Sequence, residues 1–216
     1  EPGDMDFVMG RIHTSGMIPA TGLSRDIEWV VGGDGIADVS DNELVIWYGP
    51  QDRFAVRLRP PGSAQWTEWV SPGQYLILPG DPDRAEIQIY NDLYVPANGH
   101  NRITCQLSPH RSGQQVHGIP SGTWLVRVYG ESIRDGAYHG WIERDDPRRI
   151  GALDTAQPWS FPSFFSTRSN VDNSSISSLA CGHRVVAVAN LDEAEERVHI
   201  TSSQGPTRDD RQKPEI

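Results

Sequence analysis

Hydrophobic and polar side chains alternate with a period of two residues along the middle of the chain, from position 42 to position 145. Such alternation is typical of antiparallel strands that bury one face and leave the other in water. The positions that we expect to face inward are Leu44, Ile46, Tyr48, Phe54, Val56, Leu58, Ile87, Ile89, Trp124, Val126, Val128, Tyr138 and Ile142. No amphipathic helix of ordinary length interrupts these runs.

Turn-forming sequences separate the runs, because glycine, proline, asparagine and aspartate favour the backbone conformations of tight turns. The turn sequences are Pro60-Pro61-Gly62, Ser71-Pro72-Gly73, Pro79-Gly80-Asp81-Pro82, Asn98-Gly99, Pro120-Ser121-Gly122 and Arg134-Asp135-Gly136. About eight short strands at this spacing predict a mainly-β fold, an antiparallel β-sandwich of the jelly-roll type. Its core should enclose Trp124.

The pattern changes after residue 146. Proline, serine and asparagine then predict a linker or an ordered crossing loop, and Val185–Ala189 has the length and β-branching of a buried strand. We expect that strand to pair with an available sheet edge or with Phe7–His13, and Val198–Thr201 to be a partner strand. The predicted division is 1–32 as lead-in strands, 33–146 as the sandwich, 147–173 as the linker and 174–216 as a separate segment.

Charge and cysteine content narrow the classes of function. The formal net charge is −10, and no basic face is evident, so a nucleic-acid-binding protein is not expected. No apolar run approaches the roughly 18 residues of a membrane span. Cys105 and Cys181 are far apart in sequence, and the pattern leaves open whether they form a disulfide. Their spacing does not match a structural zinc site.

The final stretch, Thr201-Ser202-Ser203-Gln204-Gly205-Pro206-Thr207-Arg208-Asp209-Asp210-Arg211-Gln212-Lys213-Pro214-Glu215-Ile216, carries the most specific motif. It resembles the subtilisin-like serine proteases, in which Ser-Ser-x-Gly-Pro-Thr-x-Asp-Gly-Arg-x-Lys-Pro-Glu/Asp-Ile precedes the segment with the serine nucleophile. Asp210 stands where the family usually has glycine. The matching positions, to which the resemblance assigns a structural loop, are Ser202, Ser203, Gly205, Pro206, Arg211, Lys213 and Pro214.

The β-rich middle is similar to a jelly-roll domain that some bacterial subtilisin-like proteases, including a clostridial spore-germination group, carry between the catalytic histidine and serine segments. Asn42–Tyr48, Asp52-Arg53-Phe54 and Gly122-Thr123-Trp124 carry this likeness. The resemblance implies a fragment of a larger protein, with 174–216 a partial piece of the α/β subtilisin core. It implies as partners the rest of the catalytic domain and a peptide or protein substrate. It requires no cofactor, leaves calcium open for the parent protein, and favours a secreted or cell-envelope location.

The catalytic motifs of the family are not found in this sequence. His117-Gly118 and His139-Gly140 lack the threonine that follows the family's catalytic histidine, and Gly122-Thr123 lacks the following serine. A serine nucleophile needs an adjacent base that is oriented by a carboxylate. We therefore expect this chain alone to be inactive, while the parent would hydrolyse peptide bonds through an Asp-His-Ser triad outside these residues.

Two other groups of residues suggest binding. Trp66, Trp69 and Tyr75 suggest a sugar-stacking platform, although packing in the core or at a sheet edge explains them more simply. Such a platform would suit the alternative function, a free-standing β-sandwich that binds carbohydrate or protein. The acidic clusters around Asp38 and Asp192–Glu196 contain oxygen ligands for Ca²⁺, but their spacing does not match an EF-hand. Solvated turns explain both clusters.

Overall fold

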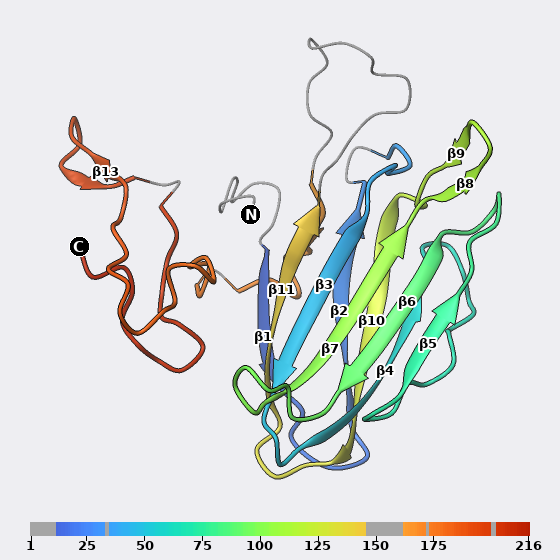
Figure 1. Cartoon of the computed structure of the whole chain (residues 1–216), viewed down its shortest axis with the longest axis horizontal. Coiled ribbons are helices and arrows are strands. Elements are labelled where there is room, and N and C mark those ends of the chain that lie inside the picture. Colours follow the sequence, from blue (N-terminus) through green and yellow to red (C-terminus); the bar gives the residue numbers. More distant parts are fainter. Residues whose placement is uncertain (1–11, 33–34, 146–161, 172, 200–201) are drawn as a thin grey trace.

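The structure is a computed structural model that describes residues 12–32, 35–145, 162–171, 173–199 and 202–216. Two antiparallel sheets lie face to face (Figure 1). In order across the larger sheet, the strands are β1 (His13–Met17), β11 (Ala137–Asp145), β3 (Asn42–Tyr48), β7 (Asn101–Ser108), β6 (Glu86–Asp92) and β5 (Tyr75–Leu78). In the smaller sheet they are β12 (Phe164–Phe165), β2 (Ser24–Val31), β10 (Gly122–Ser132) and β4 (Arg53–Arg59).

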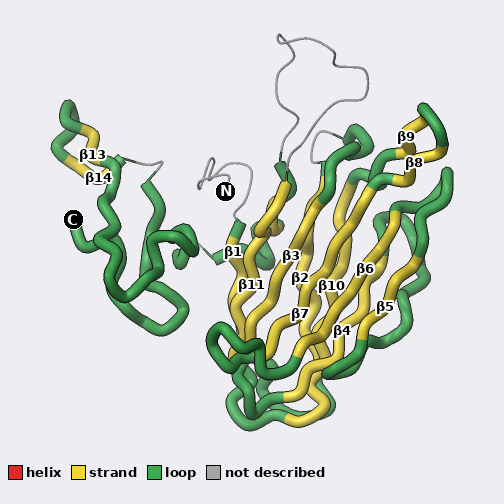
Figure 2. Tube along the Cα trace, viewed as in Figure 1, coloured by secondary structure: helices red, strands yellow, loops and turns green. Residues whose placement is uncertain are grey.

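Two short hairpins lie outside these sheets. One pairs β8 (His110–Ser112) with β9 (Gln115–His117), and the other pairs β13 (Leu191–Asp192) with β14 (Arg197–Val198). Within the described ranges all regular structure is strand, with no helix (Figure 2). The prediction of a mainly-β antiparallel sandwich is therefore confirmed. In the part of the chain that the structure covers, no helix has the length and apolar character of a membrane span.

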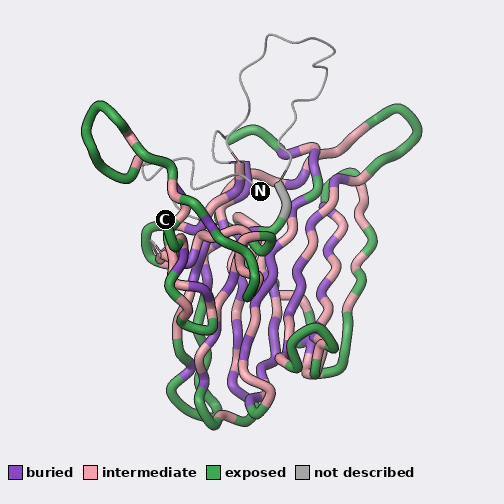
Figure 3. Tube along the Cα trace, turned by 60° about the vertical axis from the view of Figure 1, so that its left-hand side comes forward, coloured by how far each residue is buried: buried purple, intermediate pink, exposed green. Residues whose placement is uncertain are grey.

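The core lies between the two sheets, and burial alternates along the strands (Figure 3). Every position that we predicted to face inward is at most 3% exposed. Trp124 is 1% exposed, and its indole N–H donates to the Pro120 carbonyl at 3.1 Å, so its polar atom is satisfied inside the core. Trp29 of β2 and Phe165 of β12 add two large buried side chains from outside residues 33–146.

Segments on either side of residues 33–146 also enter the sheets. β1 forms one edge of the larger sheet, and β2 pairs along its length with β10. Phe164 and Phe165 pair with Val30 and Trp29 of β2. The strands of the sandwich thus come from a longer stretch of sequence than the alternating pattern covers.

The buried carboxylate of Asp52 joins the two sheets at one end. Its oxygens accept the backbone N–H groups of Arg134 at 2.6 Å, Asp135 at 3.1 Å and Gly136 at 2.9 Å. Asp52 follows β3 and precedes β4, whereas the three donors lie in the turn between β10 and β11. One carboxylate therefore holds together two connections that each pass from one sheet to the other.

The expected strand at Val185–Ala189 is wrong. These residues have no strand assignment, and Val186 and Val188 are 62% and 70% exposed. Ala187 and Ala189 instead exchange backbone hydrogen bonds with Glu215 and Ile216. β-branched residues favour a strand only when a sheet receives them, and none of the described sheets does so here. The alternative partner, Phe7–His13, lies almost entirely outside the described residues.

The two cysteines are not joined by a disulfide. Cys105 is fully buried in β7, and burial raises the pKa of its thiol. The thiol therefore acts as a small apolar side chain of the core.

Trp124→Ala is expected to lower the free energy of unfolding by about 3–5 kcal/mol, because it removes an enclosed aromatic ring and leaves a cavity. Chemical denaturation at fixed pH measures this loss. Leu179→Ala is the control, since Leu179 is 87% exposed and its truncation should change stability by less than about 0.5 kcal/mol. A loss below about 1 kcal/mol for Trp124→Ala would contradict the proposed core.

Candidate functional site

The candidate site is the C-terminal segment with the motif, together with a cleft of about 520 Å³ between that segment and the larger sheet. The segment lies beside the β1 and β11 side of the sandwich (Figure 1). Residues that line the cleft from both sides include Trp47, His100, Trp141, Cys181, Arg208 and Arg211.

Residues 162–171 bring the segment to this position by crossing from one sheet to the other. Ser166 donates its backbone N–H to the Glu28 carbonyl of β2 at 3.1 Å. The Ser169 hydroxyl accepts the N–H of Glu28 at 2.9 Å, and its carbonyl accepts the Thr14 hydroxyl of β1 at 2.5 Å. Trp141 then donates its indole N–H to the Ser174 carbonyl at 2.7 Å. Sandwich side chains and backbone thus direct the chain toward the cleft.

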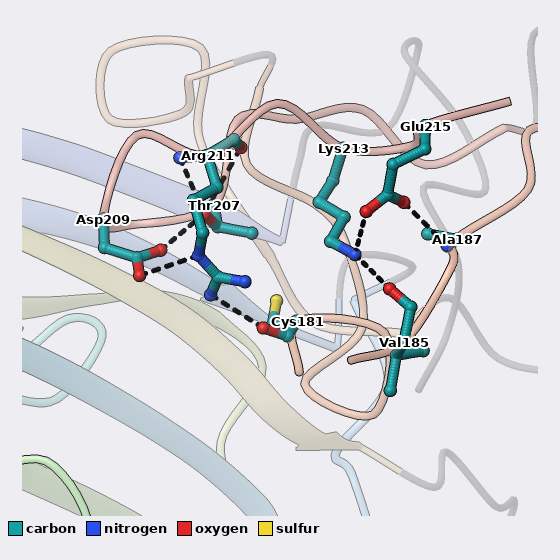
Figure 4. A network of polar contacts seen from close by, with 8 residues as sticks. All are labelled: Cys181, Val185, Ala187, Thr207, Asp209, Arg211, Lys213 and Glu215. Atoms are coloured by element: carbon teal, nitrogen blue, oxygen red, sulfur yellow. Dashed lines mark hydrogen bonds and ion pairs between the residues drawn. The ribbon is translucent and has the colours of Figure 1, made fainter. Parts of the chain in front are cut away.

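Thr207 organises the turn at the centre of the motif (Figure 4). Its N–H donates to the Arg211 carbonyl at 3.0 Å, and its hydroxyl oxygen accepts the Arg211 N–H at 3.1 Å. The same hydroxyl donates to Asp209 Oδ1 at 2.6 Å. Asp210 has φ of 61°, in the left-handed region that favours glycine. The aspartate at this position therefore adopts the kind of backbone conformation that a glycine would supply.

Arg211 connects this turn to the preceding loop. Its Nε donates to Asp209 Oδ2 at 2.8 Å, and its Nη2 donates to the Cys181 carbonyl at 2.7 Å. The hydrogen bonds from Arg211 and Thr207 lower the pKa of Asp209 to about 2, so this carboxylate is charged at neutral pH. Arg211 therefore acts as a cross-link within the loop rather than as a free cation.

Lys213 makes a second cross-link on the other side of the segment (Figure 4). Its ammonium is buried and donates to the Val185 carbonyl and to Glu215 Oε1. Glu215 Oε2 in turn accepts the Ala187 N–H at 2.8 Å. The hydrogen bond from Lys213 lowers the pKa of Glu215. This network, and not a sheet, holds the stretch around Ala187.

The other motif residues also support the backbone. The Ser202 hydroxyl is buried and accepts the Asn190 N–H at 3.1 Å. Gly205 leaves no space for a side chain, because a Cβ would lie 2.1 Å from the Lys213 carbonyl oxygen. Pro206 lines the cleft. Ser203 and Pro214 are half-buried.

Arg208 joins the motif to the sandwich. Its guanidinium lies over the Trp47 ring, 5.2 Å from the centroid, and its Nη1 lies 3.2 Å from His100 Nδ1. Because Arg208 carries only donors, His100 accepts this hydrogen bond and its Nδ1 must be deprotonated. Burial and the charge of Arg208 both lower the pKa of His100, which favours that neutral form.

His13, His139 and Trp141 stack beside the cleft; His13 is buried, and the other two rings are half-buried. His13 Nε2 lies 3.1 Å from His139 Nδ1, and the His13 and Trp141 ring centroids are 4.8 Å apart. Burial, with a smaller contribution from His139, lowers the pKa of His13 to about 4. His139, from one of the His-Gly pairs in the sequence, is thus engaged in packing. His117, from the other, lies in β9 and packs against His110 at 5.8 Å.

The three residues of the predicted stacking platform are not brought together. Trp66 and Trp69 lie against Arg57 of β4 in the smaller sheet, with 4.6 and 4.2 Å between the guanidinium and the ring centroids. Tyr75 belongs to β5 of the larger sheet and stacks on Tyr90 at 6.2 Å. Sequence proximity suggested one surface, but the chain passes from one sheet to the other between Trp69 and Tyr75.

The acidic cluster near residue 38 is used for internal hydrogen bonds. Asp38 accepts the N–H and hydroxyl of Ser40, both at 2.8 Å, and the side-chain amide of Asn42 at 2.6 Å. In the described ranges no group of three His, Cys, Asp or Glu side chains is placed to hold a metal ion. A calcium site in a parent protein remains a prediction.

Sequence reasoning missed the residues that fix the motif in place. Arg208 occupies a variable position of the family pattern, and Trp47 and His100 come from distant parts of the chain. These three residues come into contact only in the folded structure, so no local sequence pattern predicts that contact. The described polar groups of the site mostly bond one another, so the arrangement holds the backbone of the motif in position.

Comparisons with known proteins find a likeness in structure alone. No family model matches the chain, and no curated protein sequence matches it. Among solved structures, the chain is similar to the CspB protease of Clostridium perfringens, with a TM-score of 0.66 and 17% sequence identity. The match covers 97% of this chain but only 38% of that protease chain. At this identity the likeness shows a shared fold.

The free energy of unfolding is expected to fall as the pH drops from 6.5 toward 4. The folded chain keeps His13 neutral down to a pKa of about 4, whereas in the unfolded chain the same ring binds a proton near pH 6.5. Stability that is present above pH 6.5 is therefore lost over this range, by up to about 3 kcal/mol. Urea unfolding at several pH values tests this, and His13→Gln should flatten the dependence. An equal slope in the variant would contradict it.

Proposed function

We propose that this chain is the sandwich-bearing part of a subtilisin-like serine protease, in which a jelly-roll domain interrupts the catalytic domain. The single observation that carries the proposal is the pairing of a protease-like fold over 97% of the chain with the Ser202–Ile216 motif at its end. Residues 174–216 would then belong to the catalytic domain. The parent would hydrolyse peptide bonds through a triad outside this chain.

In this proposal the sandwich is a non-catalytic support. Arg208 anchors the motif to Trp47 and His100, while the Thr207 and Lys213 networks fix the loop internally. A rigid loop at this point would position the following segment of the catalytic domain, since catalytic geometry tolerates little displacement. The sandwich would thus position or stiffen the protease, with the rest of the catalytic domain as its partner and peptides as substrates of the whole.

The packing of Trp66 weighs against the alternative of a sugar-binding module. Three guanidiniums, from Arg57, Arg59 and Arg127, lie within 5.1 Å of its ring centroid. A sugar that stacked on this ring would compete with them. The protease interpretation involves no such competition, so we favour it.

Labelling with a fluorophosphonate, which reacts with activated serines, tests the proposal. The complete gene product is expected to react at one serine outside residues 1–216, whereas the isolated chain is expected to remain unlabelled. The heat-denatured complete protein is the control, because unfolding should abolish activation of the serine. Labelling of a serine within residues 1–216, or no labelling of the complete protein, would overturn the proposal.

A further inference from the structure

An arginine–tryptophan cluster covers part of the outer face of the smaller sheet, and it consists of Arg57, Arg59, Arg127, Trp66 and Trp69. The three guanidiniums lie 4.6, 5.1 and 4.4 Å from the Trp66 ring centroid. Arg57 also lies 4.2 Å from the ring centroid of Trp69, which is 38% exposed. Cations above indole faces are attracted by the ring electrons. The cluster therefore holds three positive charges around the Trp66 ring.

Only part of this charge is compensated. Arg127 pairs with Asp26 through two hydrogen bonds, at 2.6 and 2.7 Å. Arg57 and Arg59 make no ion pair with any carboxylate of the described residues. Arg57 lies directly opposite Arg127 in the β4–β10 pairing, where like charges repel. Two positive charges are thus held on the same ring without an ion-pair partner among the described residues, on a chain with a net charge of −10.

The spacing of the two unpaired arginines indicates what would compensate them. Arg57 and Arg59 are alternate residues of β4, so their side chains leave the same face about 6.6–7 Å apart along the strand. Alternate residues of an extended peptide have the same spacing. Guanidinium groups match carboxylates in a two-pronged geometry, and stacking on Trp66 orients them before a ligand arrives.

We propose that the arginine–tryptophan cluster binds an extended acidic segment of another protein, with carboxylates at alternate residues that pair with Arg57 and Arg59. The indoles of Trp66 and Trp69 provide the apolar floor beside them. The contacts of Arg208 lie on β3 and the β6–β7 loop of the other sheet, so this surface is separate from the motif cleft. The inference does not depend on the proposed protease function.

Fluorescence anisotropy with a dye-labelled peptide of alternating glutamate and glycine tests the proposal at low salt. We expect the peptide to bind, and its glutamine counterpart not to bind. Arg59→Gln and Arg57→Gln should each weaken binding by about tenfold or more, the usual effect of losing a charge-assisted hydrogen bond. Arg84→Gln is the matched control, because Arg84 lies in the β5–β6 connection and pairs with Asp81. It should leave binding unchanged.

Three further measurements separate binding from a structural role and from other ligands. Thermal unfolding of Arg59→Gln should match that of the parent chain, so that lost binding does not reflect lost structure. Inorganic phosphate at the same concentration should not displace the peptide. No peptide binding, binding that survives both arginine substitutions, or displacement by phosphate would overturn the proposal. Self-association that disappears in the double variant would also overturn it, since the occupant would then be a second copy.

Discussion

The C-terminal segment has almost no sheet of its own, so its position depends on contact with the sandwich. Among its described residues after β12, the strands are the two-residue β13 and β14, and the other described residues form loops and turns (Figure 2). Arg208 makes the contact that links the motif to the larger sheet, through Trp47 and His100. An arginine suits this position because it can stack on an indole and donate a hydrogen bond at the same time. The motif is thus fixed by a surface that is formed elsewhere in the sequence.

The sandwich can provide such a surface because internal contacts stabilise both its core and one of its ends. Large side chains such as Trp29 and Trp124 fill the space between the sheets. At one end, Asp52 binds three backbone N–H groups of the β10–β11 turn, which satisfies donors that would otherwise be buried unpaired. The outer faces are then free for other roles. One receives the C-terminal segment, and the other carries the arginine–tryptophan cluster.

The sequence predicted the strands and their inward residues correctly where the local hydrophobic pattern agrees with the burial in the structure. Alternation located the inward residues, including Trp124, because a strand that is half-buried has a period of two. Val185–Ala189 has the composition of a buried strand but is held by Lys213 and Glu215, and propensity cannot reveal which partner a strand will find. The motif predicted a structural loop, which stays a prediction, and in the structure Thr207, Asp209 and Arg211 bond one another. The meeting of Arg208 with Trp47 is a long-range contact that no local signal contains.

The central claim is that the sandwich holds the motif segment in place through Arg208 and Trp47. Hydrogen–deuterium exchange of the amides in residues 202–216, in Arg208→Ala, Trp47→Ala and the double variant, tests it most directly. We predict that each single substitution speeds exchange of these amides, that the double variant exchanges no faster than the faster single variant, and that core amides of β3 and β10 keep their protection. Unchanged exchange in Arg208→Ala, or effects that simply add in the double variant, would contradict the claim.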